Sequence, residues 1–290
     1  MGNEEIKTGG DWLRKPQTEI AVDCHVHLFP EKLFSAIRRW FAKVDWQIPY
    51  PYRTESVLAH LRAFGVRECW ALPYAHKPGT ADKLNAWMGE TARRHAMVRG
   101  FFTVHPDDED VGALARRAID EYGLVGMKIH AEVQKVDVGD DRLDPAFLAL
   151  EESGLPCVLH SGNAPYPQPI DRLDVRHVAR RMAKNPNLKA VIAHLGAPQT
   201  RDYLDLCAKY PGLHLEVSFT LVPEHIAETE PVARELGAFA DRVLFGSDFP
   251  NITFSYAEQV DNWLRLDWVK QHHNAFFGGN ARRLLTASSS

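Results

Sequence analysis

Residues 20–27 read IAVDCHVH, and this stretch gives the clearest indication of both fold and chemistry. It begins as an apolar run typical of a buried strand and ends on His25 and His27. Side chains alternate between the two faces of a strand, so histidines two residues apart point the same way. Two such imidazoles suit a divalent metal ion. The same alternation predicts that Cys24 faces away from the two histidines, outward toward the helices that cover the sheet.

Four later strand-like runs also end in polar residues that can bind a metal or move protons. A buried strand does not normally end on such groups unless they have partners. The four runs span residues 124–130, 156–161, 189–195 and 243–248, and they carry Lys128 with His130, then His160, His194 and Asp248.

Strands and helices alternate along the whole chain. Besides the five runs above, strands are predicted at 67–74, 98–104 and 213–219, and residues 109–122 have the apolar periodicity of a helix that covers a sheet. Eight such units predict a single-domain (β/α)8 TIM barrel spanning residues 18–286, after an N-terminal tail at 1–17. An open doubly wound sheet is less favoured, because no G-x-G-x-x-G follows the first strand. In a barrel the carboxyl ends of all strands share one face, so the polar residues converge there.

Composition narrows the class of protein. The 290 residues are 45% hydrophobic and 25% charged, with a formal net charge of −4 and no basic block, which argues against a nucleic-acid partner. No apolar stretch approaches the roughly 18 residues of a membrane span, and the N-terminus does not read as a signal peptide. The four cysteines show no C-x-x-C spacing. We therefore expect reduced, buried thiols, a cytoplasmic location, and a small molecule as partner; a homo-oligomer is compatible with the sequence.

The ordered series of motifs resembles the amidohydrolase superfamily, and more closely its amidohydrolase 2 group of metal-dependent TIM-barrel hydrolases and decarboxylases. The resemblance covers nearly the whole chain. Besides residues 20–27, it rests on GMKIH at 126–130, LHSG at 159–162, AHLG at 193–196, LFGSDFP at 244–250 and GNARRLL at 279–285.

The resemblance implies roles for individual residues. One divalent transition metal per chain, most often zinc, would be bound by His25, His27, His160 and Asp248. His194 would lie beside it as an acid/base or electrophilic group. Chemistry agrees, since imidazoles and a carboxylate suit zinc, and a water bound to zinc loses its proton near pH 7. Asp248 can take that proton and pass it to the leaving group.

Lys128 has three readings. Its segment also resembles the strand of ureases in which a carboxylated lysine bridges two metals, with His160 and His194 then binding the second metal. In one-metal members the lysine stays a plain amine that can pair with a substrate carboxylate. We expect one metal, with Lys128 and His130 as substrate-binding residues. A lysine that merely extends from the barrel mouth is the third, less favoured reading.

Three functions are compatible with these residues. The favoured one is hydrolysis of an ester, lactone or amide in a small, carboxylate-bearing substrate by metal-activated water. The alternative is non-oxidative decarboxylation on the same scaffold, and the third is a barrel that binds metal without turnover. The aromatic-rich insert at 30–54 is expected to form a lid or pocket wall, or else a packing helix or dimer contact. His76, His105 and residues 163–166 follow strands and are expected on the same face.

Overall fold

Eight parallel strands alternate with helices in the computed structural model, which describes residues 11–162 and 174–286. The strands are β1 (Ile20–Val26), β2 (Val66–Ala71), β3 (Val98–Gly100), β4 (Met127–Ile129), β5 (Pro156–Leu159), β6 (Lys189–Ile192), β7 (Leu213–Glu216) and β8 (Val243–Leu244). All eight predicted strands are present. Each ends before its predicted boundary, so the polar residues that follow β4, β5, β6 and β8 lie just beyond the regular sheet.

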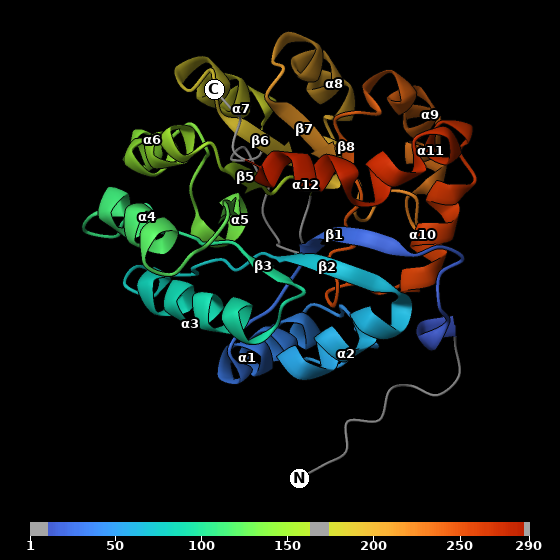
Figure 1. Cartoon of the computed structure of the whole chain (residues 1–290), viewed down its shortest axis with the longest axis horizontal. Coiled ribbons are helices and arrows are strands. Elements are labelled where there is room, and N and C mark those ends of the chain that lie inside the picture. The colour runs from blue at the N-terminus through green and yellow to red at the C-terminus, as the bar shows by residue number, and fades with distance from the viewer. Residues whose placement is uncertain (1–10, 163–173, 287–290) are drawn as a thin grey trace.

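The strands pair in chain order as β1-β2-β3 and β4-β5-β6-β7-β8, all in parallel. Both remaining seams are bridged. Phe102 pairs with Met127 between β3 and β4, and Val26 pairs with Phe249 between β1 and the end of β8. Backbone hydrogen bonds reinforce these seams, from Lys128 N to Phe102 O at 2.8 Å and from Cys24 N to Phe245 O at 3.0 Å. The strands thus form the predicted barrel, with helices around it (Figure 1).

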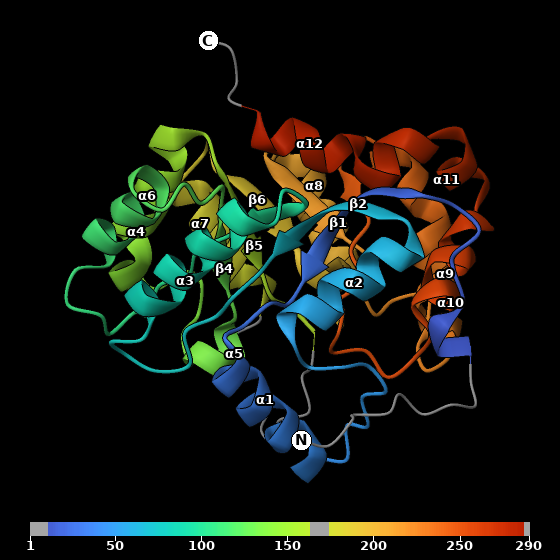
Figure 2. The ribbon, with the colours of Figure 1, turned by 60° about the horizontal axis from the view of Figure 1, so that its bottom comes forward.

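The helices of the described residues lie along the chain between the strands and after β8. They are α1 (Glu31–Lys43), α2 (Thr54–Phe64), α3 (Ala81–Arg94), α4 (Val111–Asp120), α5 (Ala131–Gln134), α6 (Asp144–Ser153), α7 (Val175–Lys184), α8 (Thr200–Lys209), α9 (Ile226–Glu235), α10 (Tyr256–Leu264), α11 (Asp267–Gln271) and α12 (Asn280–Leu285). Figure 2 shows α1 and α5 at one end of the barrel and α12 at the opposite end. Within the described residues, no helix combines the length and apolar character needed to cross a bilayer.

Apolar side chains form two buried layers. The larger lies between strands and helices. The smaller, the inner cluster, fills the barrel and comprises Val22, Cys24, Trp70, Leu72, Phe101, Val158, Val191, Leu244, Ala281 and Leu284. Because Ala281 and Leu284 belong to α12, that helix closes the end of the barrel away from the polar residues.

The predicted orientation of Cys24 is wrong, because a bulge interrupts β1. Asp23 pairs with Cys69 and Val26 with Ala71, so two residues of β1 stand opposite the single residue Trp70. A bulge breaks the strict alternation of faces. Cys24 therefore joins the inner cluster instead of the outer layer. All four cysteines are buried and free, as expected.

The described part of the predicted N-terminal tail contacts the barrel. Residues 11–13 form a short 3-10 helix. Beyond it, Arg14 Nη1 lies 2.5 Å from a carboxylate oxygen of Asp261 in α10, and the backbone N–H of Gln17 donates to the same carboxylate at 3.0 Å. The ring of Trp12 packs edge-on against Tyr50.

Candidate active site at the carboxyl ends of the strands

A cavity of about 270 Å³ opens where the strands end. Polar side chains form one part of its wall: His27, His130, His160, His194 and Asp248. Aromatic side chains form another part: Phe41, Trp46, Tyr74 and Phe219. The structure thus brings five of the seven predicted site residues to one cavity. Of the other two, His25 lies directly behind this wall and Lys128 lies beneath it.

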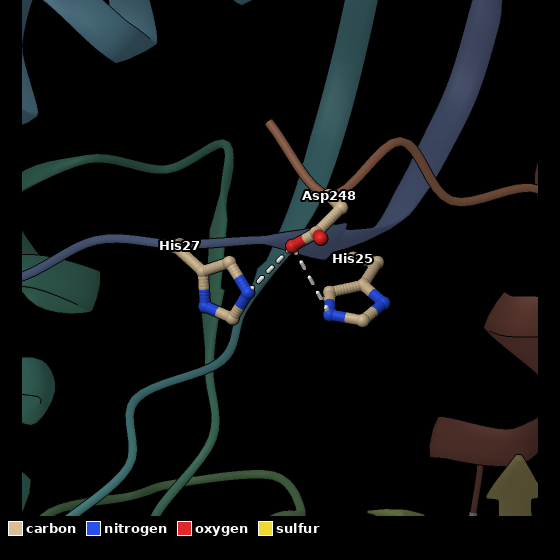
Figure 3. A group of neighbouring side chains, drawn as sticks. All are labelled: His25, His27 and Asp248. Atoms are coloured by element: carbon tan, nitrogen blue, oxygen red, sulfur yellow. Dashed lines mark ion pairs between the residues drawn. The ribbon is translucent and has the colours of Figure 1, made fainter. Parts of the chain in front are cut away.

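His25, His27 and Asp248 form one group of potential metal ligands (Figure 3). Asp248 Oδ1 lies 2.7 Å from His27 Nε2 and 3.6 Å from His25 Nε2. The backbone brings them together, because the N–H of Asp248 donates to His25 O at 2.8 Å across the β8–β1 seam. Asp248 itself adopts a left-handed conformation with φ of 64°, which turns its carboxylate toward the two rings.

This group fits a divalent metal. The other ring nitrogen of each histidine is already engaged: His25 Nδ1 lies 2.7 Å from Glu216 Oε2, and His27 Nδ1 donates to Leu72 O at 2.8 Å. Metal-binding histidines are held in this way, with Nε2 left for the ion. In the part of the chain that the structure describes, the buried Asp248 Oδ1 has no hydrogen-bond partner beyond its contacts with the two Nε2 atoms. A buried carboxylate oxygen that faces two imidazole nitrogens is what a cation site provides.

Glu216, at the end of β7, is a site residue that the sequence analysis did not identify. It is fully buried beneath His25, and its carboxylate accepts hydrogen bonds from the N–H and Oγ of Ser218. Burial raises the pKa of Glu216 to about 8. The signal was available, because the predicted strand 213–219 also contains polar residues near its carboxyl end.

Asp23, also overlooked, ties β1 to the turn that carries Asp248. Its carboxylate accepts hydrogen bonds from Ser247 N at 3.0 Å, Ser247 Oγ at 2.6 Å, Tyr256 Oη at 2.9 Å and His25 N at 3.1 Å. Burial raises its pKa to about 6, although the hydrogen bonds from Ser247 and the others oppose this rise. Hydrogen bonds therefore hold the candidate ligands in position from both sides, through Glu216 inside the barrel and through Asp23 on its outer face.

His194 stands between this group and His160. Its ring centroid lies 5.1 Å from that of His25 and 4.9 Å from that of His160. Its Nδ1 lies 2.8 Å from Ser218 Oγ, and its Nε2 lies 3.3 Å from His160 Nδ1. Burial is the main cause that lowers the pKa of His194 to about 4, so this imidazole is neutral near pH 7.

His160 is not part of the close group formed by His25, His27 and Asp248. It stacks on His130 with ring centroids 3.7 Å apart, and its Nε2 lies 3.5 Å from Glu132 Oε2. Potential metal ligands thus fall into neighbouring groups, and His130, Glu132 and His160 form one of them. Glu132, on the first turn of α5, is a further residue that the sequence analysis did not single out.

Lys128 is fully buried below the cavity and is not part of its lining. Its Nζ lies 3.4 Å from His25 Nε2. Burial lowers its pKa to about 8, although Asp248 and Glu216 oppose this effect. A lysine that extends out of the barrel mouth is thereby excluded. In this position the amine faces the candidate metal ligands and not the substrate space.

The aromatic insert contributes to the cavity wall through Phe41 and Trp46. The indole N–H of Trp46 donates to Asn251 O at 2.8 Å, and its ring lies 5.7 Å from that of Phe219. His76 is exposed, and His105 accepts a hydrogen bond from Asp107 N in a turn; neither lines the cavity. Residues 163–166 lie outside the described residues.

Comparisons with known proteins bear on the family and the fold of the chain. The sequence matches the family model described as Amidohydrolase over residues 22–286. No curated protein matches the chain.

Solved structures share the barrel fold at low sequence identity. A TIM-barrel protein of Bordetella bronchiseptica is 20% identical, with a TM-score of 0.70 over 92% of this chain and 98% of that one. A candidate 2-pyrone-4,6-dicarboxylic acid hydrolase of Pseudomonas putida is 21% identical, with a TM-score of 0.65 over 92% and 98%. A 5-carboxyvanillate decarboxylase of Novosphingobium aromaticivorans, in complex with manganese and a nitrobenzoic acid, is 17% identical, with a TM-score of 0.66 over 98% and 99%.

Proposed function

Because the chain belongs to the amidohydrolase family, we propose that it is a metal-dependent enzyme that hydrolyses an ester, lactone or amide bond in a small substrate. One observation carries this proposal: His25, His27 and Asp248 converge at a cavity that His194 also lines. A family that contains both hydrolases and decarboxylases leaves the reaction open, so the chemistry must be argued from the site.

His25, His27 and Asp248 would hold the metal. Two imidazoles and a carboxylate are a ligand set that zinc accepts, and a manganese-bound neighbour makes manganese the second ion to test. When bound, such an ion supplies Lewis acidity, which polarises a carbonyl oxygen and lowers the pKa of a coordinated water.

Asp248 is the proposed proton carrier. Its carboxylate is nearly buried but lines the cavity, so it can reach both the attacking water and the scissile bond. It would accept the proton of the water and deliver it to the leaving oxygen or nitrogen. The bond between Asp248 N and His25 O holds the carboxylate in place during both transfers.

His194 is proposed to stabilise the oxygen on which negative charge develops. Its lowered pKa keeps it neutral, so it would act by hydrogen bonding and not by a full positive charge. Ser218 Oγ lies 2.8 Å from Nδ1 and fixes the ring on one side, while Nε2, which faces His160 Nδ1 at 3.3 Å, would donate to the substrate oxygen in place of that contact.

The cavity wall favours a small planar or apolar substrate. Trp46 and Phe219 offer ring faces, and Asn251 holds the Trp46 indole in position. In the described lining the residues that can become cationic are all histidines. A substrate carboxylate would therefore meet His130 or His225 at the wall, since Lys128 is covered.

Non-oxidative decarboxylation is the second candidate. It is favoured by the manganese-bound decarboxylase, whose fold covers 98% of this chain. In this reaction the residues of the site would have different roles. The bound ion and the histidines would orient the carboxylate to be lost, and Asp248 or His194 in its protonated form would donate a proton to the carbon.

A substrate panel separates the two reactions. The purified chain, loaded with zinc or with manganese, is given lactones, esters and aromatic carboxylates, and release of acid and of carbon dioxide is measured in parallel. Hydrolysis predicts acid release without carbon dioxide, and this activity should be lost in Asp248→Asn. Carbon dioxide from an aromatic acid would establish the second candidate. Equal rates in the wild type and Asp248→Asn would contradict both.

A further inference from the structure

Asn251 lies in the turn that follows Asp248 and lines the cavity. Its backbone N–H donates to Asp248 O at 2.9 Å, which fixes its position relative to that candidate metal ligand. Its backbone oxygen accepts a hydrogen bond from the indole N–H of Trp46 at 2.8 Å. Only 6% of the residue is exposed. Its side chain is therefore held between the candidate ligands and the aromatic part of the wall.

Tyr52 sets the orientation of the Asn251 side-chain amide. The Tyr52 hydroxyl donates to Asn251 Oδ1 at 2.6 Å, and among the described residues it has no second acceptor. Burial raises the pKa of Tyr52 well above its usual value, and nearby Tyr74 and Asp248 add to this rise. The hydroxyl therefore keeps its proton, and a hydroxyl that donates needs the oxygen of the amide on its side. The Tyr52 ring is in turn held edge-on against Phe34, with centroids 5.3 Å apart.

This orientation leaves the amide nitrogen of Asn251 with protons to donate. In the part of the chain that the structure describes, Nδ2 has no hydrogen-bond partner, and it is not one of the unpaired atoms enclosed by protein. Other neutral side chains of the lining differ, because Ser161, Thr220 and Thr229 each donate the hydroxyl proton to a backbone carbonyl. Since Asn251 lines the cavity, its free N–H groups are available to a molecule bound there.

The surroundings of this donor indicate what it would bind. Trp46 and Phe219, with ring centroids 5.7 Å apart, offer faces that suit a planar ring. The described lining includes neither lysine nor arginine. A neutral amide donor beside ring faces fits an oxygen acceptor carried on the ring of the ligand.

We propose that Asn251 is a substrate-binding residue whose Nδ2 donates to a carbonyl or carboxylate oxygen on a ring, away from the bond that is broken. Tyr52 is the positioning residue that holds the amide for this contact. The inference rests on the proposed function, because it takes the reacting bond to lie at Asp248. It adds a substrate class, namely planar ring compounds that carry a second oxygen acceptor.

Matched pairs of ligands test the contact. The whole chain, loaded with Zn²⁺, is titrated by calorimetry with 3- and 4-acetylbenzoate and with 3- and 4-ethylbenzoate. The acetyl and ethyl groups have similar shapes, but only the acetyl group has a carbonyl oxygen. We expect the wild type to bind at least one acetyl compound roughly 3- to 10-fold more tightly than its ethyl partner, the net effect of one neutral hydrogen bond.

Variants assign this preference to Asn251. Asn251→Asp keeps an oxygen for Tyr52 but has no N–H to donate, and Asn251→Ala removes the amide, so the preference should vanish in both. Tyr52→Phe should reduce it in part, since the amide is no longer held, with zinc content unchanged. A purely structural role would weaken binding of both members of a pair equally. Thr220→Val, which removes a hydroxyl bonded to Val217 O at 2.5 Å, should keep the preference.

Contrary results are equally definite. Circular dichroism checks folding, and Asn251→Asp serves alone if Asn251→Ala does not fold. The inference is wrong if none of the four compounds binds, if the wild type has no preference in either pair, or if the preference survives in Asn251→Asp. Hydrolysis of lactones and esters is measured on the same samples. Hydrolysis without the preference would contradict this inference alone, whereas the preference without hydrolysis would contradict the proposed function alone.

Discussion

Three residues of the cavity wall adopt backbone conformations that side-chain-bearing residues rarely use. His194, Phe219 and Asp248 have φ values of 55°, 62° and 64°. Each such residue costs of order 1–3 kcal/mol and persists only where its surroundings hold it, and such residues cluster at functional sites. The holding contacts are visible here, since Phe219 N donates to Gln259 Oε1 at 3.2 Å and Asp248 N donates to His25 O. The strained turns aim these three side chains into the cavity.

His194 is the residue whose replacement best separates chemistry from metal binding. His194→Asn keeps a polar side chain of similar reach but removes the imidazole. We expect a loss in turnover of roughly 10²-fold or more, because a positioned hydrogen-bond donor is lost from the transition state. Metal content should stay near that of the wild type. If metal and activity fall in proportion, then His194 is a ligand and its proposed role is wrong.

Glu216 acts on the site through His25. Its Oε2 lies 2.7 Å from His25 Nδ1 and fixes the ring that would present Nε2 to the metal. Glu216→Gln should lower metal affinity by about 10- to 100-fold, as expected when the hydrogen-bond partner that orients a metal-binding histidine is altered. Competition with a chelator measures this. Glu151→Gln, which alters a carboxylate bound to Asn185 on another part of the molecule, should leave the affinity unchanged.

Between elements, one contact that supports the site runs from β1 to α10. Tyr256 at the start of α10 donates to the fully buried Asp23, which also holds Ser247. Tyr256→Phe should lower the free energy of unfolding by about 1–3 kcal/mol, because a buried carboxylate loses a donor. Urea denaturation measures the change. Tyr122→Phe removes a comparable hydrogen bond, 3.2 Å long, from the half-exposed Asp82 and should cost clearly less.

The order of elements could be predicted from the sequence because it follows from hydrophobic periodicity. All eight strands lie where apolar runs occur, and α4 lies within the predicted helix 109–122. The bulge in β1 could not be predicted in this way. A bulge depends on how β1 pairs with β2. Neither Cys24 nor His25 is a residue type, such as glycine, that would indicate a bulge in the sequence. The orientation of Cys24 was predicted wrongly because it depends on the pairing of two strands and not on the sequence of one strand.

The sequence predicts which residues meet at the candidate site only where the order of the strands determines their positions. The sequence predicts that His25, His27 and Asp248 meet, since they end β1 and β8, which are neighbours in a closed barrel. It does not say which way the His160 ring turns, and this depends on its contacts with His194 and Glu132. Glu132 was overlooked because a single glutamate after a strand is common on protein surfaces, and Glu216 because no catalytic or ligand motif surrounds it in its strand. Only burial distinguishes them.

At the scale of the whole molecule, the two ends of the barrel interior differ in chemistry. The inner cluster and α12 fill the amino-terminal end, while charged and imidazole groups gather at the carboxyl end. His214, in the amino-terminal half of β7, is an exception to this division. It is half-buried away from the site, with Nδ1 3.1 Å from Gly212 O and with Arg242, Asp241 and Arg283 nearby.

His214 should make the stability of the barrel sensitive to acid. Burial is the main cause that lowers its pKa from 6.5 to about 4. Between these values the unfolded chain binds a proton that the folded chain does not, so unfolding becomes more favourable as the pH falls from 6.5 to 4. Above pH 6.5 both states are neutral at this residue and the effect is absent. The loss is about 1–3 kcal/mol, since one pKa unit corresponds to about 1.4 kcal/mol and the residue is only half-buried.

Replacing this histidine by an uncharged residue tests the effect. His214→Gln should flatten the dependence of unfolding free energy on pH between 4 and 6.5 relative to the wild type, as measured by urea denaturation at a series of pH values. His272→Gln alters an exposed histidine and should leave the slope unchanged. Because His214 lies outside the cavity lining, its variant should keep wild-type metal content at pH 7. An unchanged slope in His214→Gln would mean that other groups carry the acid sensitivity, with the buried imidazoles around His25 the next to examine.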